Sequence, residues 1–197
     1  MNDLDSIGEI LKNHFEELTE RIIYFNTTGY SFEEWFNWES TYALKKSGKW
    51  VCSPKPAYRK YGRGFENTYG DIFIKNIVDE DRKSKSYFIE VKIIHDHTDM
   101  KWAVKINDDT VKLKAIRKSG GGLDDIIPIQ ILLLVSKYSY DEITKDKDND
   151  WVAELACQHF QHVRHKPPFI NRPWVMSETG RISMLGTALE CKKCDRI

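Results

Sequence analysis

Two apolar stretches of the sequence carry charged residues whose types and spacing suit metal-dependent chemistry. Asp71 begins the first stretch, residues 71–78, while Glu90 and Lys92 lie within the second, residues 87–94. Alternate residues of a strand point to the same face, so Glu90 and Lys92 should lie side by side. Charges in such a β-branched run must be paired or bound to an ion, because burying them otherwise costs several kcal/mol. Carboxylates that hold a divalent cation, beside an ammonium that holds or activates a water, predict metal-assisted phosphodiester cleavage.

The arrangement resembles the motif of the PD-(D/E)xK nuclease superfamily. Asp71 matches the Asp of the motif, and Glu90-Val91-Lys92 matches its (D/E)xK. Gly70 stands where the eponymous Pro would be, and many members lack that Pro. An Asp at a strand start, then a hairpin-like connector and an ExK inside an apolar strand, is more specific than ExK alone.

The resemblance covers roughly residues 31–136 and implies both a fold and a metal site. The fold would be α/β, with a mixed central sheet flanked by helices and an αβββαβ core. Asp71 and Glu90, helped by the backbone carbonyl of Val91, would bind Mg²⁺, or Mn²⁺ in its place. Lys92 would position or deprotonate the water that attacks phosphorus.

A further acidic residue of the site is expected from the segment before the strands. Residues 31–34 have the pattern of a capping box, which predicts a helix over residues 32–47. Glu39 lies on the apolar face of that helix. Many nucleases of this superfamily take a Glu from the helix before the meander, and Glu39 fits that role; the alternative is an ion pair with a Lys or Arg at the core edge. Glu33 and Glu34 are interpreted as first-turn residues that favour the helix dipole.

Length and composition limit the possible classes of protein. The chain has 197 residues, enough for one domain with a real core, and its 30 basic and 30 acidic residues leave no net charge. No apolar run approaches the length of a membrane span, since Pro128 and Gln130 interrupt the longest one. The first residues lack the basic and apolar regions of a signal peptide, so we expect a cytoplasmic protein without a membrane partner.

Hydrophobic periodicity and chain breakers predict how this single domain is organised. An N-terminal helix should span residues 4–25, ahead of the core, and the C-terminal additions should span residues 137–197. Within the additions we expect a helix over residues 151–162. From residue 167 onward we expect irregular structure with a short helix over residues 183–190.

Two basic sets of residues are candidates for contact with double-stranded DNA. The first lies among tyrosines in the loop that leads to Asp71, and it consists of Lys55, Arg59, Lys60 and Arg63. The second carries donors for guanine and adenine edges, and it consists of Arg164, Lys166, Arg172 and Arg181. Cutting both strands with one site per chain favours a homodimer.

Two further motifs carry weaker signals. Cys191 and Cys194 have the spacing of a zinc knuckle, but Zn²⁺ needs two more ligands, so a reduced pair of thiols is the preferred interpretation. Residues 120–122 are glycines without the context of a phosphate-binding loop, so no nucleotide cofactor is expected.

The sequence therefore favours a Mg²⁺-dependent DNA endonuclease, most like a type II restriction enzyme. A structure-selective nuclease, such as a junction resolvase or repair enzyme, would share the same site. A catalytically silent DNA-binding module of the same fold is the alternative from another functional class. For Glu90 and Lys92 themselves, the alternative interpretation is that they lie on a solvated cross-strand face.

Overall fold

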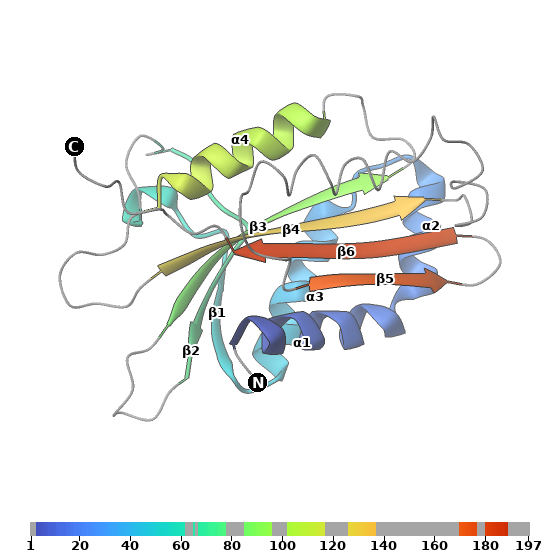
Figure 1. Cartoon of the computed structure of the whole chain (residues 1–197), viewed down its shortest axis with the longest axis horizontal. Coiled ribbons are helices and arrows are strands. Elements are labelled where there is room, and N and C mark those ends of the chain that lie inside the picture. Colours follow the sequence, from blue (N-terminus) through green and yellow to red (C-terminus); the bar gives the residue numbers. More distant parts are fainter. Residues whose placement is uncertain are drawn as a thin grey trace.

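A mixed α/β architecture with a central six-stranded sheet is seen in the computed structural model (Figure 1). The structure describes residues 3–61, 65, 67–77, 85–95, 102–116, 126–136, 170–176 and 180–188. Helices cover both faces of the sheet, with α4 on one side and α1 to α3 on the other. The expected fold class, a mixed sheet flanked by helices, is confirmed at this level.

The sheet has the strand order β1-β2-β3-β4-β6-β5. Its first three strands form an antiparallel meander of β1 (Trp50–Pro54), β2 (Ile72–Asn76) and β3 (Ser86–His95). Helix α4 (Trp102–Lys114) lies between β3 and β4 (Ile126–Ser136) in the chain, and these two strands are parallel. The antiparallel pair β5 (Ile170–Met176) and β6 (Gly180–Ala188) completes the sheet against β4.

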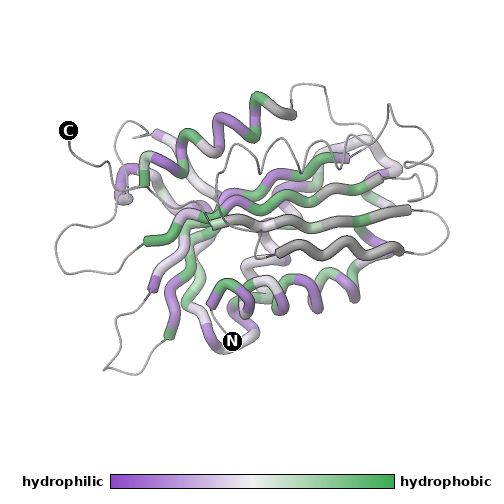
Figure 2. The backbone as a smooth tube through the Cα atoms, in the orientation of Figure 1, coloured by the Kyte–Doolittle hydropathy of each residue, from purple (hydrophilic) through white to green (hydrophobic). Residues whose placement is uncertain are grey.

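Strand β3 lies in the interior of the sheet and is buried on both faces, as its apolar composition predicts. It pairs with β4 along its whole length, from Ser86↔Ile126 to His95↔Val135. Figure 2 shows the hydrophobic colouring concentrated on the central strands, with hydrophilic residues interspersed on β3. Glu90 and Lys92 both belong to β3, so the strand that builds the core also carries the predicted site.

The N-terminal segment forms two helices instead of the single helix expected over residues 4–25. Helix α1 (Asp3–Glu17) ends where Leu18 leaves the helical conformation, with φ −104° and ψ 10°, and α2 (Thr19–Thr28) follows. The hydroxyl of Thr19 donates to the carbonyls of the preceding turn, a local bond that competes with a continuous helix. Hydrophobic spacing does not reveal such a break, because both helices pack on the same core.

Helix α3 (Glu33–Lys46) matches the predicted helix closely, but the predicted capping box is wrong. Phe32, rather than Ser31, occupies the N-cap position, and no side chain caps the helix. Glu34 pairs instead with Lys55, at 2.7 Å between Oε1 and Nζ.

The prediction of irregular structure with a short helix near the C-terminus is also wrong for the described residues. Residues 170–176 and 180–188 are strands, and Ile182, Met184 and Gly186 are buried at alternate positions of β6. Period-two burial is typical of a strand, and short apolar runs are easily misread as helical. The helix expected over residues 151–162 lies outside the described residues. None of the described helices is long and apolar enough to cross a membrane.

Candidate active site

Asp71 immediately precedes β2, and its carboxylate accepts a backbone hydrogen bond from β3 just beyond the point where the two strands stop pairing. The pairing of β2 with β3 extends only to Ile72↔Ile89. Beyond that point, the backbone N–H of Val91 donates to Oδ2 of Asp71 at 2.7 Å, and Asn37 Nδ2 donates to Oδ1 at 2.7 Å. Burial raises the pKa of Asp71 despite these hydrogen bonds. The Asp71 carboxylate is thus fixed by β3 and α3 together.

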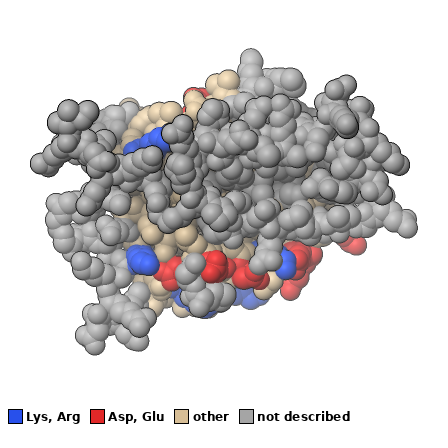
Figure 3. Space-filling model, in the orientation of Figure 1, with Lys and Arg blue, Asp and Glu red and all other residues tan. Residues whose placement is uncertain are grey.

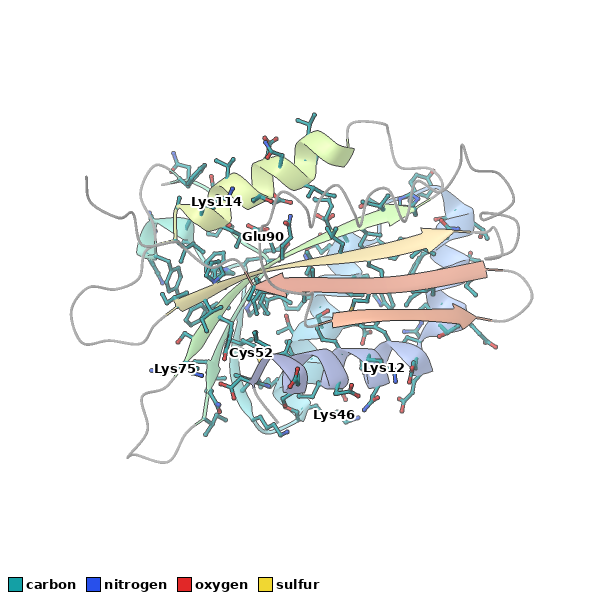
Figure 4. All side chains as sticks on the ribbon, viewed as in Figure 1. Lys12, Lys46, Cys52, Lys75, Glu90 and Lys114 are labelled. Carbon is teal, nitrogen blue, oxygen red and sulfur yellow. The ribbon has the colours of Figure 1, made fainter. Side chains whose placement is uncertain are left out.

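Glu90 lies between the sheet and α4 and is almost completely buried, with 4% of its surface exposed (Figure 4). The hydroxyl of Tyr58 donates to Oε1 at 2.6 Å, and Nζ of Lys112 lies 3.8 Å from the same oxygen. The pKa of Glu90 is raised to about 9, chiefly by burial and also by the carboxylates of Asp71 and Asp109, while Lys112 and Tyr58 oppose the rise. In the metal-free protein, Glu90 is therefore a neutral acid at pH 7.

Lys92 forms a two-point contact with Glu33, which begins α3. Its Nζ donates to Oε1 and Oε2 of Glu33 at 3.0 and 2.9 Å, and it lies 3.7 Å from Oδ2 of Asp109. Burial would lower the pKa of Lys92, but Glu33, Asp109 and Asp71 together raise it. Lys92 is therefore a stable ammonium that can donate to a water or a phosphate oxygen but is poorly suited to remove a proton.

Glu33, rather than Glu39, is the acidic residue that α3 brings to this group. The carboxylate of Glu33 also accepts a hydrogen bond from the backbone N–H of Ile93 at 3.4 Å. Asp71 accepts in the same way from the N–H of Val91, two residues earlier on β3. Glu39 lies instead against α1, with Oε2 2.8 Å from Nε2 of His14 and Oε1 4.0 Å from Arg21. The structure thus places Glu39 in the ion-pair alternative and not beside the predicted catalytic residues.

Helix α4 covers the group with a second charged pair. Asp109 is buried, and its Oδ1 lies 2.5 Å from Nζ of Lys112. Among the described residues, the charged group thus consists of four carboxylates and two ammonium groups, those of Glu33, Asp71, Glu90, Asp109, Lys92 and Lys112. If all are ionised, the group has an excess of two negative charges. Such an excess in a buried site is neutralised either by protons or by a bound cation.

The donor atoms of the group fit a hard divalent cation. The oxygens of Asp71 and Glu90 and the backbone carbonyl of Val91 are the ligand types that Mg²⁺ prefers. In addition, Oδ1 of Asn37 is buried without a hydrogen-bond partner among the described residues, although its amide nitrogen binds Asp71. The described residues hold no cluster of three or more His, Cys, Asp and Glu side chains arranged as metal ligands. The two carboxylates would therefore share the ion with backbone oxygen and water, as Mg²⁺ sites usually do.

Packing explains why position 70, just before Asp71, is a glycine. A Cβ atom at this position would lie 2.2 Å from Cε1 of Phe88, well inside van der Waals contact. The ring of Phe88 is itself fixed between Tyr58 and Tyr61, with ring centroids 4.6 and 5.4 Å apart. A Pro or any other side chain at position 70 would displace this ring from its place beside the site.

The candidate DNA-contact residues are only partly described. Lys55 is paired with Glu34, while Arg59 and Lys60 are exposed on the short 3-10 helix η1 (Tyr58–Lys60). Arg172 lies on β5 and Arg181 on β6. Arg63, Arg164, Lys166, Cys191 and Cys194 fall outside the described residues. In the view of Figure 3, described acidic side chains lie along the edge where α1 lies, with basic side chains among them.

The residues of the candidate site that were not predicted from the sequence are Glu33, Asn37, Tyr58, Asp109 and Lys112. Their signal is weak because each belongs to another element and reaches the site only through the tertiary fold. Glu33 and Asn37 are four residues apart on α3, a spacing that places them on the same helix face. That spacing was the one local signal available.

The C-terminal part of the chain matches a family model. Residues 142–197 match the model of a family described as a protein of unknown function (DUF3565). No curated protein and no solved structure matches the chain. The family match begins after β4, so it does not include Asp71, Glu90 or Lys92.

Proposed function

We propose that this chain is a Mg²⁺-dependent DNA endonuclease of the PD-(D/E)xK type, most like a type II restriction enzyme. The observation that carries the proposal is the convergence of Asp71, Glu90 and Lys92, with Glu33 fixed against Lys92. The carboxyl of Glu90 lies near enough to that of Asp71 to lower its pKa, so the two could bind one ion. A solvated cross-strand face would not bury Glu90 to this extent.

The order of elements supports the same proposal. Helix α3, the meander β1-β2-β3, helix α4 and strand β4 follow one another in the order helix, three strands, helix, strand. The parallel pairing of β3 with β4 also agrees with a helical connection between them. We therefore interpret residues 31–136 as a restriction-endonuclease-like core, to which α1, α2, β5 and β6 are added.

The residues of the site divide the chemistry between them. Asp71, Glu90 and the carbonyl of Val91 would hold the ion, with Asn37 Oδ1 as a further oxygen nearby. A bound Mg²⁺ would offset the charge that develops on the phosphate and would lower the pKa of a bound water. Lys92 is already protonated, so its part is to orient the attacking water or a phosphate oxygen rather than to deprotonate the water. Glu33 keeps the ammonium of Lys92 in place.

Cleavage of a substrate panel by the full chain tests the proposal. Supercoiled plasmid, linear duplexes of mixed sequence and a four-way junction would be incubated with Mg²⁺, with Mn²⁺, with Ca²⁺ and with EDTA. Discrete plasmid fragments in Mg²⁺ or Mn²⁺, and none in EDTA, would support a restriction enzyme, and the expected homodimer would be checked by sedimentation equilibrium. Sequence-independent cutting of the junction would indicate the structure-selective alternative. Binding of DNA without cleavage under every condition would contradict the proposal and favour a silent module.

A further inference from the structure

Tyr58 reaches Glu90 from a turn that lies far from it in the sequence. The phenol is completely buried, and its hydroxyl donates to Oε1 of Glu90 at 2.6 Å. Lys112 approaches the same oxygen from α4 at 3.8 Å. Within the described part of the chain, both of these groups thus converge on one of the two carboxylate oxygens of Glu90.

The backbone holds Tyr58 and Asp71 in one rigid unit. The N–H of Tyr58 donates to the carbonyl of Thr68, the N–H of Gly70 to the carbonyl of Pro56, and the N–H of Lys55 to the carbonyl of Asp71, all at 2.9 Å. The turn that carries Tyr58 is therefore tied to the segment that ends at Asp71. A change in the position of one residue must move the other.

A small apolar cluster packs around the ring of Tyr58. Its members come from the turn, from β3, from α4 and from the residues just after α4, and they are Tyr58, Phe88, Leu113 and Ile116. All four are buried, and the rings of Tyr58 and Phe88 lie 4.6 Å apart. The cluster leaves the ring little freedom, so the direction of the hydroxyl is set by packing before any ligand binds.

We propose that Tyr58 is a positioning residue of the site, whose hydroxyl holds Oε1 of Glu90 so that Oε2 is presented to the divalent ion. The inference rests on the proposed function, because it assumes that Glu90 is a metal ligand. Lys112 acts in the same direction, since its ammonium lies on Oε1 and repels a cation from that oxygen. A carboxylate ligand that accepts a hydrogen bond on one oxygen is held in a single orientation. Residues that hydrogen-bond to metal ligands commonly have this effect.

Binding of Mn²⁺ to the full chain without DNA tests this role and needs no activity. Calorimetric titrations would compare the wild type with Tyr58→Phe, which keeps the ring and removes only the hydroxyl. Tyr61→Phe is the matched control, because Tyr61 lies in the same turn and also packs on Phe88. We expect Tyr58→Phe to weaken Mn²⁺ binding by about tenfold or more, the usual size of an effect behind a metal ligand, and Tyr61→Phe to leave it unchanged.

A second measurement guards against a simple loss of folding. Melting curves of each variant in EDTA and in saturating Mn²⁺ report the same affinity as a stabilisation of the folded protein. We expect the metal-induced rise in Tm to be smaller in Tyr58→Phe than in Tyr61→Phe. Equal Mn²⁺ affinity in wild type and Tyr58→Phe would overturn the positioning role.

Asp71→Ala separates the failure of this inference from the failure of the proposed function. Loss of Mn²⁺ binding in Asp71→Ala, with unchanged binding in Tyr58→Phe, would overturn the role of Tyr58 alone. If the wild type binds no Mn²⁺, or if Asp71→Ala binds it as well as the wild type, the metal site itself is absent and both proposals fail.

Discussion

Along β3, neighbouring residues point to opposite faces of the sheet and meet opposite environments. On one face, Ile89 and Val91 join the large core built with α1, α2 and α3. On the other face, Glu90 and Lys92 lie among charged and polar side chains of α4, of the turn before β2 and of the start of α3. One backbone thus serves as core on one side and as the wall of a charged site on the other.

The difference between the two faces shows where stability and chemistry are separated in this molecule. The apolar face contributes through burial, which is non-directional and tolerates small shifts. The polar face depends on particular distances between ionised groups, whose removal leaves a buried charge or lone pair without its partner. Substitutions on the apolar face should therefore change stability, and substitutions on the polar face should change chemistry.

The strongest test of this separation is the removal of a proposed metal ligand. Asp71→Ala should abolish cleavage in Mg²⁺, because it removes an anionic ligand, while the far-UV circular dichroism stays that of the wild type. Asp108→Ala is the matched control, since Asp108 is exposed on α4 beside the buried Asp109. Wild-type cleavage by Asp71→Ala would show that the polar face is not the site.

Lys92→Met should be next in size. It keeps the length of the side chain and removes the ammonium, so we expect turnover to fall by about 10²–10³-fold, as for other groups that stabilise charge in a transition state. Binding of DNA in Ca²⁺ should be nearly unchanged, because Lys92 is largely covered by Glu33 and Asp109. A parallel loss of DNA binding would assign Lys92 to docking instead.

On the opposite face, Ile89→Ala should produce the reverse pattern. Ile89 is fully buried in the large core, so its truncation should lower the free energy of unfolding by about 2–5 kcal/mol. Cleavage per folded molecule, measured below the melting transition, should stay near that of the wild type. A large drop in turnover while the variant is fully folded would mean that packing on the apolar face affects the chemistry on the polar face.

The raised pKa of Glu90 predicts a pH dependence that belongs to the polar face alone. The pKa of Glu90 is about 9 in the folded protein against an ordinary 4.5, so the folded state binds the proton more tightly. Below pH 4.5 both states are protonated and this contribution to stability is fully present; as pH rises toward 9 the unfolded chain loses its proton first and the contribution is lost.

Melting curves in EDTA between pH 5 and pH 9 measure this effect. Their downward slope should be reduced in Glu90→Gln, which cannot titrate, and saturating Mg²⁺ should raise Tm most at the alkaline end, where the carboxylate is readily freed for the ion. An identical slope in Glu90→Gln would assign the pH dependence to other groups.

Sequence alone was enough for the part of the site that is local. Asp71, Glu90 and Lys92 could be selected because a strand alternates its side chains and a charge in an apolar run needs a partner. The apolar runs over residues 71–78 and 87–94 also predicted strands β2 and β3. These features depend on neighbours in the chain, which a sequence displays directly.

The remainder of the site depends on tertiary contacts. The buried face of α3 includes Ser40 and Thr41 beside Phe36 and Leu44, so the helix has no clean apolar stripe from which to judge its orientation. The apolar neighbours of Glu39 therefore pointed to the wrong side of the helix. Tyr58 lies 32 residues from Glu90 and meets it only because the turn folds back along residues 68–71.

The two glutamates of α3 give the finest comparison, because they have the same chemistry on one helix. Glu33→Gln keeps the shape but removes the charge that fixes Lys92, so turnover should fall by about tenfold, a usual effect for a residue behind the reacting groups. Glu39→Gln removes a partly exposed pair with His14 and Arg21, and it should lower the free energy of unfolding by about 1 kcal/mol or less. Its turnover should equal that of the wild type, because Glu39 contacts α1 and not the charged site.

Parallel cleavage assays and melting curves of the two variants show which glutamate serves the site. A loss of turnover in Glu39→Gln with normal turnover in Glu33→Gln would restore Glu39 as the third acidic residue of the site and would contradict the orientation of α3.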